Sequence, residues 1–345
     1  MALLWVEGFE EYGTTTGADR TTQLRRRYML GVTSSPTYCL TGGRLGGYCL
    51  YGTGTSSYLL RNSLLTSADT LIVGEAVSPV AGTAAEYTFL RLYDGTQLGV
   101  NLTLDNNTGE ISAYCNATLL GRTTGLGLVS GAWYYVEVKV KCHDSAGTVE
   151  VRVAGVTKLS LAGQNTKAGA HYYHDGIRLD LMNYFYHDDV YACDNTGSVN
   201  NDFLGNCRIV GLLPSADTAT KDWTPGTGTS HYAMVNETLE NDDTGNNYLE
   251  DGTSGHTELW DYTDLPTLGA IKGLQVSTIC RETDAQTIGL ITPVKSGATT
   301  SLDSPRPIGS TLYVARIRIV ELDPNGPAAW TQASVNAAQF GVRVA

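Results

Sequence analysis

The sequence of 345 residues predicts an all-β protein built from two modules. Short runs of alternating or continuous apolar residues recur, with Gly-, Asn- and Asp-rich breakers between them. The composition also favours strands and turns, because 39 Gly accompany 20 Tyr and only 5 Phe, and Tyr suits half-exposed sheet faces. Strands spaced this closely, without helical periods between them, indicate an antiparallel sandwich and not a parallel α/β sheet.

The clearest strand signal is a hairpin over 133–161. Three valines alternate with Glu and Lys in 136–141, the turn "DSAG" follows, and three valines return in 149–153. This period of two predicts half-buried strands with their valines on one face. Shorter strand-like runs precede the hairpin at 70–80, 86–94, 98–104 and 110–116.

The composition of the chain changes after Asn195. A turn-rich segment leads into a strand signal at 208–214, and a stretch of low hydrophobicity over about 215–257 predicts a long irregular arm. Strand signals then return at 270–283, 287–297 and 310–324, before a short helical turn and a final strand within 330–345. We therefore expect one domain over 1–197 and a second β-rich, sandwich-like module over 198–345.

The charge of the chain argues against nucleic acid as a partner. The net charge is −12, and the basic cluster Arg25-Arg26-Arg27 fits a solvated or interface patch better than a phosphate track. No apolar run approaches the roughly 18 residues that a membrane span needs. The N-terminal segment lacks a secretory signal, so we expect synthesis in the cytoplasm and no membrane partner.

Seven cysteines occur, and none forms a C-x-x-C pair. They fit either small buried apolar residues or disulfides formed after release from the cell, with one thiol left over. Cys193 and Cys207 flank the junction between the two modules, so a disulfide between them would staple it.

The segment "YFYHDDVYACD" carries the acids that most resemble a site. Neighbouring strand residues point to opposite faces, so Asp188 and Asp189 are not expected to form a catalytic carboxylate pair. With Asp194 they are weak calcium candidates, although the calcium-loop pattern D-x-[DN]-x-[DN]-G is missing. Alternatively, one acid faces solvent and the other holds a loop backbone. His171 and His174, in a turn-rich segment nearby, fit surface or interface residues better than metal ligands. We expect no catalytic residue, cofactor or metal.

The first module resembles the concanavalin A-like (laminin-G-like) jelly-roll superfamily. The resemblance rests on "VEGFEEYG" (6–13), "GGRLGGYCL" (42–50), the hairpin segment 133–155 and "HDDVYACDNTG" (187–197), in that order. It implies a jelly-roll β-sandwich. Glycanases on this fold typically carry an E-x-D-x-(x)-E strand, and "VEVKVK" and "VEVRV" have Lys or Arg where further acids should be. This departure from the glycanase pattern argues against hydrolase activity, so we expect that the chain is not an enzyme.

The whole arrangement is similar to virion proteins of tailed bacteriophages, in which such a jelly roll continues into a second β-rich region. The pattern "DD-Y--D--G--N--FLG" and a final "W----VNA-QFG" carry this resemblance. The matching residues are Asp188, Asp189, Tyr191, Asp194, Gly197, Asn200, Phe203, Leu204 and Gly205, then Trp330, Val335, Asn336, Ala337, Gln339, Phe340 and Gly341. It implies a structural protein of the virion head, neck or tail that binds other virion proteins, with a homotrimer as the expected assembly.

The alternative is a carbohydrate-binding, lectin-like or glycan-processing protein on the same fold. Sandwiches of this kind bind sugars on a concave face or in loops at one end, so host-surface glycans are a further expected partner. A glycan-cleaving enzyme would need two acids across a cleft lined by exposed Trp or Tyr.

Overall fold

A computed structural model of the chain describes residues 2–12, 18–31, 37–53, 57–64, 66–82, 85–182, 184–237, 246–267, 269–283 and 288–345. It divides into two compact units, Met1–Ile209 and Val210–Ala345. Among the described residues, the α-helices are α1 (Ala18–Arg27) and α2 (Gln332–Asn336), and everything else regular is strand or a short 3₁₀ turn. The prediction of an all-β protein is confirmed. Neither helix is long and apolar enough to cross a membrane.

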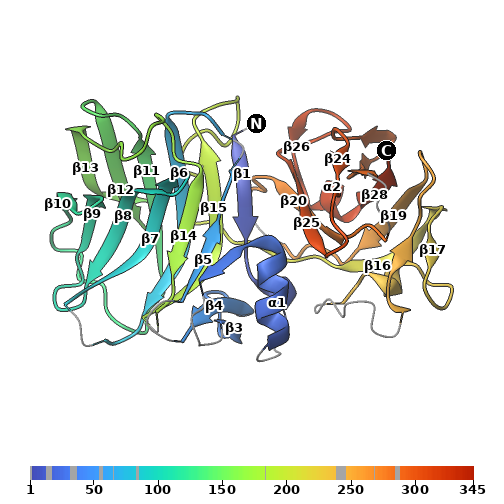
Figure 1. Cartoon of the computed structure of the whole chain (residues 1–345), viewed down its shortest axis with the longest axis horizontal. Coiled ribbons are helices and arrows are strands. Elements are labelled where there is room, and N and C mark those ends of the chain that lie inside the picture. The colour runs from blue at the N-terminus through green and yellow to red at the C-terminus, as the bar shows by residue number, and fades with distance from the viewer. Residues whose placement is uncertain are drawn as a thin grey trace. The chain divides into compact units, whose positions relative to one another are not determined.

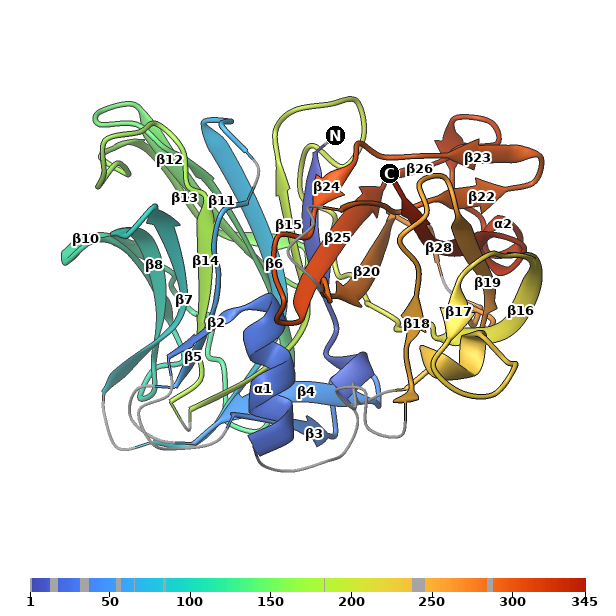
Figure 2. The same cartoon turned by 45° about the vertical axis from the view of Figure 1, so that its right-hand side comes forward.

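The first unit is a sandwich of two antiparallel sheets (Figure 1 and Figure 2). Sheet A has the order β13-β12-β11-β6-β15-β4-β3, with β1 also paired to β15. Its strands are β1 (Leu3–Glu7), β3 (Thr37–Thr41), β4 (Tyr48–Gly52), β6 (Thr70–Pro79), β11 (Tyr134–Lys141), β12 (Gly147–Val153), β13 (Val156–Gln164) and β15 (Phe185–Asp194). Sheet neighbours that are distant in sequence, such as β6 and β15, give the sandwich its jelly-roll character.

Sheet B has the order β10-β9-β8-β7-β14-β5-β2. Its strands are β2 (Met29–Gly31), β5 (Tyr58–Arg61), β7 (Glu86–Asp94), β8 (Gln97–Asp105), β9 (Ile111–Cys115), β10 (Thr118–Arg122) and β14 (Gly176–Asp180). Figure 2 shows β10, β8 and β7 in one layer and β13, β12 and β11 in the other. The core of the unit lies between these layers.

The alternation of apolar and polar residues along the strands determines which side chains form that core. β11 and β12 pair in the predicted register, with Val138 opposite Val151 and Val140 opposite Val149, and all four side chains are buried. The Glu and Lys residues between them point to the other face of the sheet. The hairpin predicted from the sequence is therefore confirmed, and the valines of sheet A pack in one cluster with the leucines of sheet B.

The helix α1 was not predicted, because its sequence "ADRTTQLRRR" has no apolar stripe. Its arginines fit the expected solvated or interface patch only in part. Arg25 is exposed, but the side chain of Arg27 is only 7% exposed and forms an ion pair with Glu11. Its guanidinium carbon lies 5.2 Å from the ring centre of Tyr12. A nearby buried carboxylate, Glu7, accepts a hydrogen bond from the Phe9 amide, and this acidic surrounding explains why a cation is buried here.

The second unit is built on a mixed-length antiparallel sheet with the order β16-β19-β28-β21-β24, to which β22 and β23 are added beside β28. Its strands are β16 (Pro214–Lys221), β19 (Thr257–Tyr262), β21 (Gly289–Ile291), β22 (Val294–Ser296), β23 (Thr299–Ser301), β24 (Arg306–Pro307) and β28 (Gln339–Val344). Three strand pairs accompany it: β17 (Thr224–Pro225) with β18 (Leu249–Glu250), β20 (Leu274–Cys280) with β25 (Val314–Val320), and β26 (Leu322–Asp323) with β27 (Ala328–Ala329). The 3₁₀ turns are η1 (Glu10–Tyr12) in the first unit and η2 (Tyr232–Met234) in the second.

The stretch over 215–257 is more regular than the predicted arm. It contains most of β16, which pairs with β19, and the turn η2, whose first amides donate to the Asp217 carboxylate. β16 lies at the edge of its sheet and has the sequence "PSADTATK". Because an edge strand needs few apolar residues, this polar sequence did not predict a strand. Residues 238–245 of the stretch lie outside the described residues.

Candidate functional site

Residues 198–209, which we call the strap, cover part of the outer face of sheet A. The Leu204 amide donates to the Tyr191 hydroxyl at 3.0 Å, and the Gly205 amide donates to Glu137 Oε1 at 2.9 Å. The Ile209 amide donates to Asp189 Oδ1 at 2.7 Å. The strap thus belongs to the first unit, which ends at Ile209 and not at the expected residue 197.

The pair Asp188 and Asp189 anchors this strap. A β-bulge interrupts β15 between Asp188 and Tyr191, and Asp189 has a φ of 50°. Both carboxylates therefore reach the same partner: Asp188 Oδ2 accepts from the Arg44 amide at 2.8 Å, and Asp189 Oδ2 accepts from Arg44 Nε at 2.9 Å. The expectation that these acids point to opposite faces is wrong at this position, because the bulge breaks the period of two.

Both acids are almost completely buried, at 3% exposure each. Burial, followed by the negative charge of Asp189, raises the pKa of Asp188 to about 7. Asp194 has other partners, since its carboxylate accepts from the Thr196 amide and the Thr66 hydroxyl. Among the described residues, no group of three or more His, Cys, Asp or Glu side chains is arranged to hold a metal ion. The structure thus does not bring the three calcium candidates into one site.

Cys193 and Cys207 lie at the two ends of the same region. Cys193 is buried on β15, and its thiol donates to the Asp202 carbonyl oxygen at 3.6 Å. Cys207 is half-buried within the strap, and both residues are thiols in the structure. The disulfide between them stays a prediction for the oxidised protein.

The histidines near this segment each have their own surroundings. His187 lies inside the sandwich, with Nδ1 2.6 Å from Glu75 Oε2. His171 is held by Asp94, with 2.6 Å between Nδ1 and Oδ1. His174 is buried, and burial lowers its pKa to about 4, so the interpretation of a surface residue is wrong for His174. These contacts are structural and bring no metal ligands together.

The outer face of sheet B is a different surface. Leu90, Leu102 and Ile177 point into the core, so the residues that alternate with them point outward. Figure 1 shows the strands β9, β8, β7 and β14 side by side in this sheet. We call the outward set the polar face; it comprises Tyr58, Glu86, Thr88, Arg91, Tyr93, Asn101, Thr103, Asp105, Ser112, Tyr114, Arg122, Arg178 and Asp180.

One half of the polar face is built around Asp180, which is fully buried. Its Oδ2 accepts from Arg91 Nε at 2.6 Å, and its Oδ1 accepts from Arg178 Nε at 2.9 Å. The two arginines are directly opposite each other on β7 and β14. The Arg178 guanidinium carbon also lies 3.7 Å from the ring centre of Tyr58. The Asp180 carboxylate therefore holds both arginine side chains in place.

The other half is built around Glu86. Its carboxylate accepts from the Thr103 hydroxyl at 2.7 Å and from the Tyr114 hydroxyl at 3.0 Å. Arg122 joins Glu86 to Asp105 through ion pairs of 3.3 and 3.2 Å. Burial and the hydrogen bond to Glu86 raise the pKa of Tyr114, so its hydroxyl stays a neutral donor.

Asn101 lies between these halves, opposite Arg91 on one side and Tyr114 on the other. Its side chain is almost buried, at 7% exposure, and its Oδ1 has no hydrogen-bond partner among the described residues. A buried amide without a partner is uncommon and costs free energy unless something binds it. The centre of the polar face thus contains a buried amide oxygen whose hydrogen-bonding position is unfilled.

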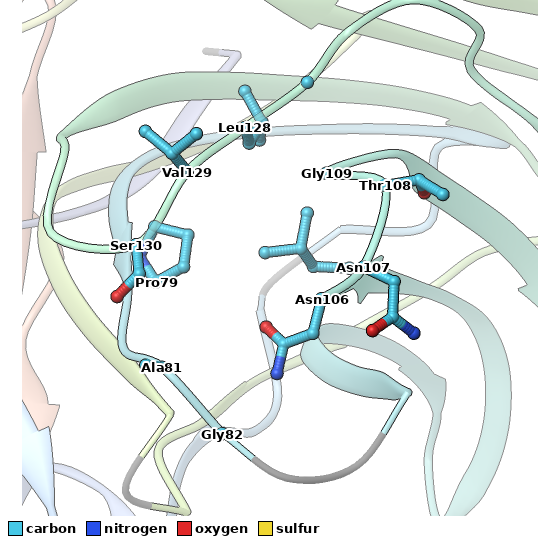
Figure 3. A pocket seen from close by; sticks show the side chains of 12 residues that line it. Pro79, Ala81, Gly82, Asn106, Asn107, Thr108, Gly109, Leu128, Val129 and Ser130 are labelled. Carbon is cyan, nitrogen blue, oxygen red and sulfur yellow. The ribbon is translucent and has the colours of Figure 1, made fainter.

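A pocket of about 370 Å³ opens at one end of the sandwich (Figure 3). Three loops surround it, contributing Pro79, Ala81 and Gly82, then residues 106–109 and 127–130. None of the residues that line it in the described part of the chain has an ionisable side chain. It therefore offers small polar groups and main chain but no group for proton transfer.

The sequence shows the alternation that produces the polar face, but this alternation does not distinguish the face from that of any other strand. In "EYTFLRLYD" the polar residues alternate with apolar ones as they do in any half-buried strand. What distinguishes this face is that β14, far away in sequence, adds Arg178 and Asp180 beside Arg91. Only the order of strands in the sheet shows that juxtaposition.

The fold and its faces define a β-sandwich jelly roll, and solved structures of that class resemble this chain. A search with protein-family models finds no match, and a search of curated protein sequences finds none either. Similar solved structures include an endo-β-1,4-glucuronan lyase from the fungus Trichoderma reesei, with 12% identity over 55% of this chain and 94% of the lyase and a TM-score of 0.36. The cellulose-induced protein Cip1 has 11% identity over 55% of this chain and 96% of its own, with a TM-score of 0.40. Domain 4 of an arabinanase from Geobacillus stearothermophilus, in complex with arabinotriose, has 13% identity over 56% and 93% of the two chains and a TM-score of 0.37.

The likeness goes no further than the jelly-roll architecture, which the sequence predicted. It contradicts one expectation: the prediction that the chain is not an enzyme is wrong as an inference from this fold, because a glucuronan lyase is among the similar structures. The missing acids in "VEVKVK" and "VEVRV" exclude only one strand pattern. None of the three structures named above is a phage protein, so that resemblance stays a prediction.

Proposed function

We propose that the first unit recognises a carbohydrate through the polar face of sheet B. The observation that carries the proposal is Asn101, an almost buried amide with an unfilled hydrogen-bonding position in the middle of that face. Arginine, threonine and tyrosine side chains surround it. A sugar ring presents hydroxyl groups that both donate and accept, which suits such a mixed surface.

The aromatic side chains of the face support the same ligand class. Tyr58, Tyr93 and Tyr114 are half-buried, so each ring is partly accessible. A tyrosine ring offers an apolar surface with a polar end, and the C–H groups of a sugar pack on such a surface. Hydrogen bonds from Asn101 and packing on the tyrosines would then hold one chain of sugar rings.

Binding to an array of oligosaccharides tests this proposal. Asn101→Ala and Tyr114→Ala should each weaken binding at least tenfold, because each removes a contact in the middle of the face. The matched control is Lys158→Ala, on the exposed strand β13 of the other sheet. Equal binding by all three variants, in proteins whose circular dichroism is unchanged, would place the sugar site elsewhere.

The same samples show whether the bound sugar is cleaved. Glu86 accepts a 3.0 Å hydrogen bond from Tyr114 and is an acid at the centre of the face, so Glu86→Gln is the variant to compare with the wild-type protein. Release of shorter oligosaccharides by the wild type, and its loss in Glu86→Gln, would identify an enzyme. Unchanged oligosaccharides after long incubation would identify a binding module.

Assembly into a tailed-phage virion remains a proposal beside this one. It comprises the virion as location, other virion proteins as partners and a homotrimer as assembly. Light scattering on the purified chain measures the mass of the assembly directly. A mass three times that of the 36.9 kDa chain is the expected result, and a monomer at high concentration would contradict the trimer.

A further inference from the structure

We infer that the polar face takes an uncharged oligosaccharide and not an acidic polysaccharide such as a polyuronate. This inference rests on the proposed function, because it names the class of sugar that the same face would bind. It follows from how the charges of the face are paired. Six side chains of the set are ionised, and each already contacts a group of opposite charge.

The charges of the polar face balance. Three are positive and three are negative, namely Arg91, Arg122 and Arg178 against Glu86, Asp105 and Asp180. Each arginine is in an ion pair with an acid of the same face. The first unit as a whole, residues 1–209, has 19 acidic against 15 basic residues. A polyanion would therefore meet no excess positive charge, which is what attracts such ligands.

The arginines are also held in place by their partners. Both oxygens of Asp180 are used, one by Arg91 and one by Arg178, and Asp180 is fully buried. A sugar carboxylate that drew an arginine away would leave a buried carboxylate short of a partner. Breaking such a pair is strongly unfavourable. A neutral hydroxyl can instead accept from the arginine N–H groups that remain without disturbing the pair.

The size of the face sets the length of the ligand. The polar face crosses β10, β9, β8, β7, β14 and β5, and six strands with the usual spacing span about 24 Å. Several sugar rings fit along this distance. A neutral hexasaccharide is therefore long enough to contact both halves of the face at once.

Isothermal titration calorimetry on the full chain tests the inference with two sets of probes. The neutral set is cellohexaose, xylohexaose, mannohexaose and chitohexaose, and the acidic set is hexagalacturonate and hexaguluronate. We expect at least one neutral hexasaccharide to bind ten times more tightly than either acidic one. Its affinity should change less than twofold between 50 and 500 mM NaCl, because no counterions are released.

Two outcomes separate this inference from the proposed function. Tighter binding of an acidic hexasaccharide that is lost in Asn101→Ala would overturn the inference and keep the polar face as the site. No binding of any probe, or binding that Asn101→Ala and Tyr114→Ala leave unchanged, would overturn the proposed function itself.

A charge variant sharpens the test. Glu86→Gln keeps an acceptor for Tyr114 and removes one negative charge, so the face becomes net positive. If charge balance sets the ligand class, this variant should bind hexagalacturonate at least threefold more tightly than the wild type does. The control is Glu150→Gln on β12, in the other sheet. An equal gain in both variants would mean that overall charge, and not the polar face, decides the preference.

Discussion

The two outer faces of the sandwich both carry acidic side chains, but these side chains have different partners on each face. On sheet A, Glu137 and Asp189 are buried under the strap and accept hydrogen bonds from its main chain. On sheet B, acids and arginines pair with one another along the surface, and Asn101 is left with an unfilled position. The buried carboxylates of sheet A thus stabilise the fold by accepting hydrogen bonds from backbone amides of the strap. On sheet B, in contrast, side chains hold one another, and one buried amide oxygen among them has no hydrogen-bond partner among the described residues.

The largest effect is expected where the strap is anchored. Asp189→Ala removes the partner of Arg44 and of the Ile209 amide, and it places Ala at a φ of 50°. Breaking a buried pair costs about 3 kcal/mol or more of the free energy of unfolding, which urea denaturation measures. Asp189→Asn, which tolerates the same φ and keeps an acceptor, should cost clearly less.

The exposed end of the strap supplies the control for this experiment. Asp202→Ala removes an ion pair with Lys139 in which the Asp202 side chain is 62% exposed. Pairs of this kind contribute about 1 kcal/mol or less. If Asp202→Ala destabilised the protein as much as Asp189→Ala does, the strap would not be held by its buried acids.

A second prediction concerns the packing under the strap. A β-carbon on Gly74 of β6 would lie 2.2 Å from a ring carbon of Tyr191, whose hydroxyl contacts Glu137. The ring cannot move without breaking that contact, so Gly74→Ala should lower the free energy of unfolding by about 2 kcal/mol. Gly252→Ala is the matched control, because a β-carbon there meets nothing within 4 Å. Thermal unfolding at one pH compares the two, and equal melting temperatures would contradict the packing described for Tyr191.

A third prediction uses pH. The folded protein keeps a proton on Asp188 up to its pKa of about 7, whereas an unfolded Asp loses it near its ordinary value of 3.8. Folding then favours the protonated form, so stability from this group is present at low pH and is lost as the pH rises from about 4 to 7. Asp188→Asn should remove this loss, on the order of 4 kcal/mol over the whole pH interval.

The comparison is made as a difference between the two proteins. Burial also raises the pKa of Glu7 to about 7. Glu7 is present in both proteins, so its contribution to the pH dependence of stability cancels in the difference. Urea unfolding of the wild type and Asp188→Asn at pH 5 and pH 8 gives the four free energies. A difference that does not change with pH would mean that Asp188 is ionised in the folded state throughout this range.

The smallest effect on stability is expected on the polar face. Tyr114→Phe removes only a half-buried hydroxyl that contacts Glu86, so unfolding should change by about 1 kcal/mol or less. Binding of a neutral hexasaccharide should nevertheless fall severalfold, because that hydroxyl donates its hydrogen to Glu86 and can still accept one from a sugar hydroxyl at the centre of the face. A large loss of stability with unchanged binding would reverse the roles that we assign to the two faces.

The sequence predicted the all-β class and the hairpin of β11 and β12, because valines at a period of two report directly on a buried face. It did not predict α1, whose sequence has no apolar stripe, or β16, whose polar residues suit a sheet edge. Asp188 and Asp189 stood out by composition, but the bulge that turns both toward Arg44 is a backbone feature without a sequence signature. Asn101 carried no local signal, since its role depends on strands that are distant in sequence.

Hydroxyl-radical footprinting with mass spectrometry tests the central claim most directly, because it measures the accessibility of individual tyrosine rings. The protein is labelled with and without an equimolar mixture of the four neutral hexasaccharides at equal radical dose. We predict that oxidation of Tyr58, Tyr93 and Tyr114 falls, while oxidation of Tyr172, a 45% exposed ring outside the polar face, is unchanged. Unchanged oxidation of the three polar-face tyrosines under conditions where the sugars bind would contradict the account.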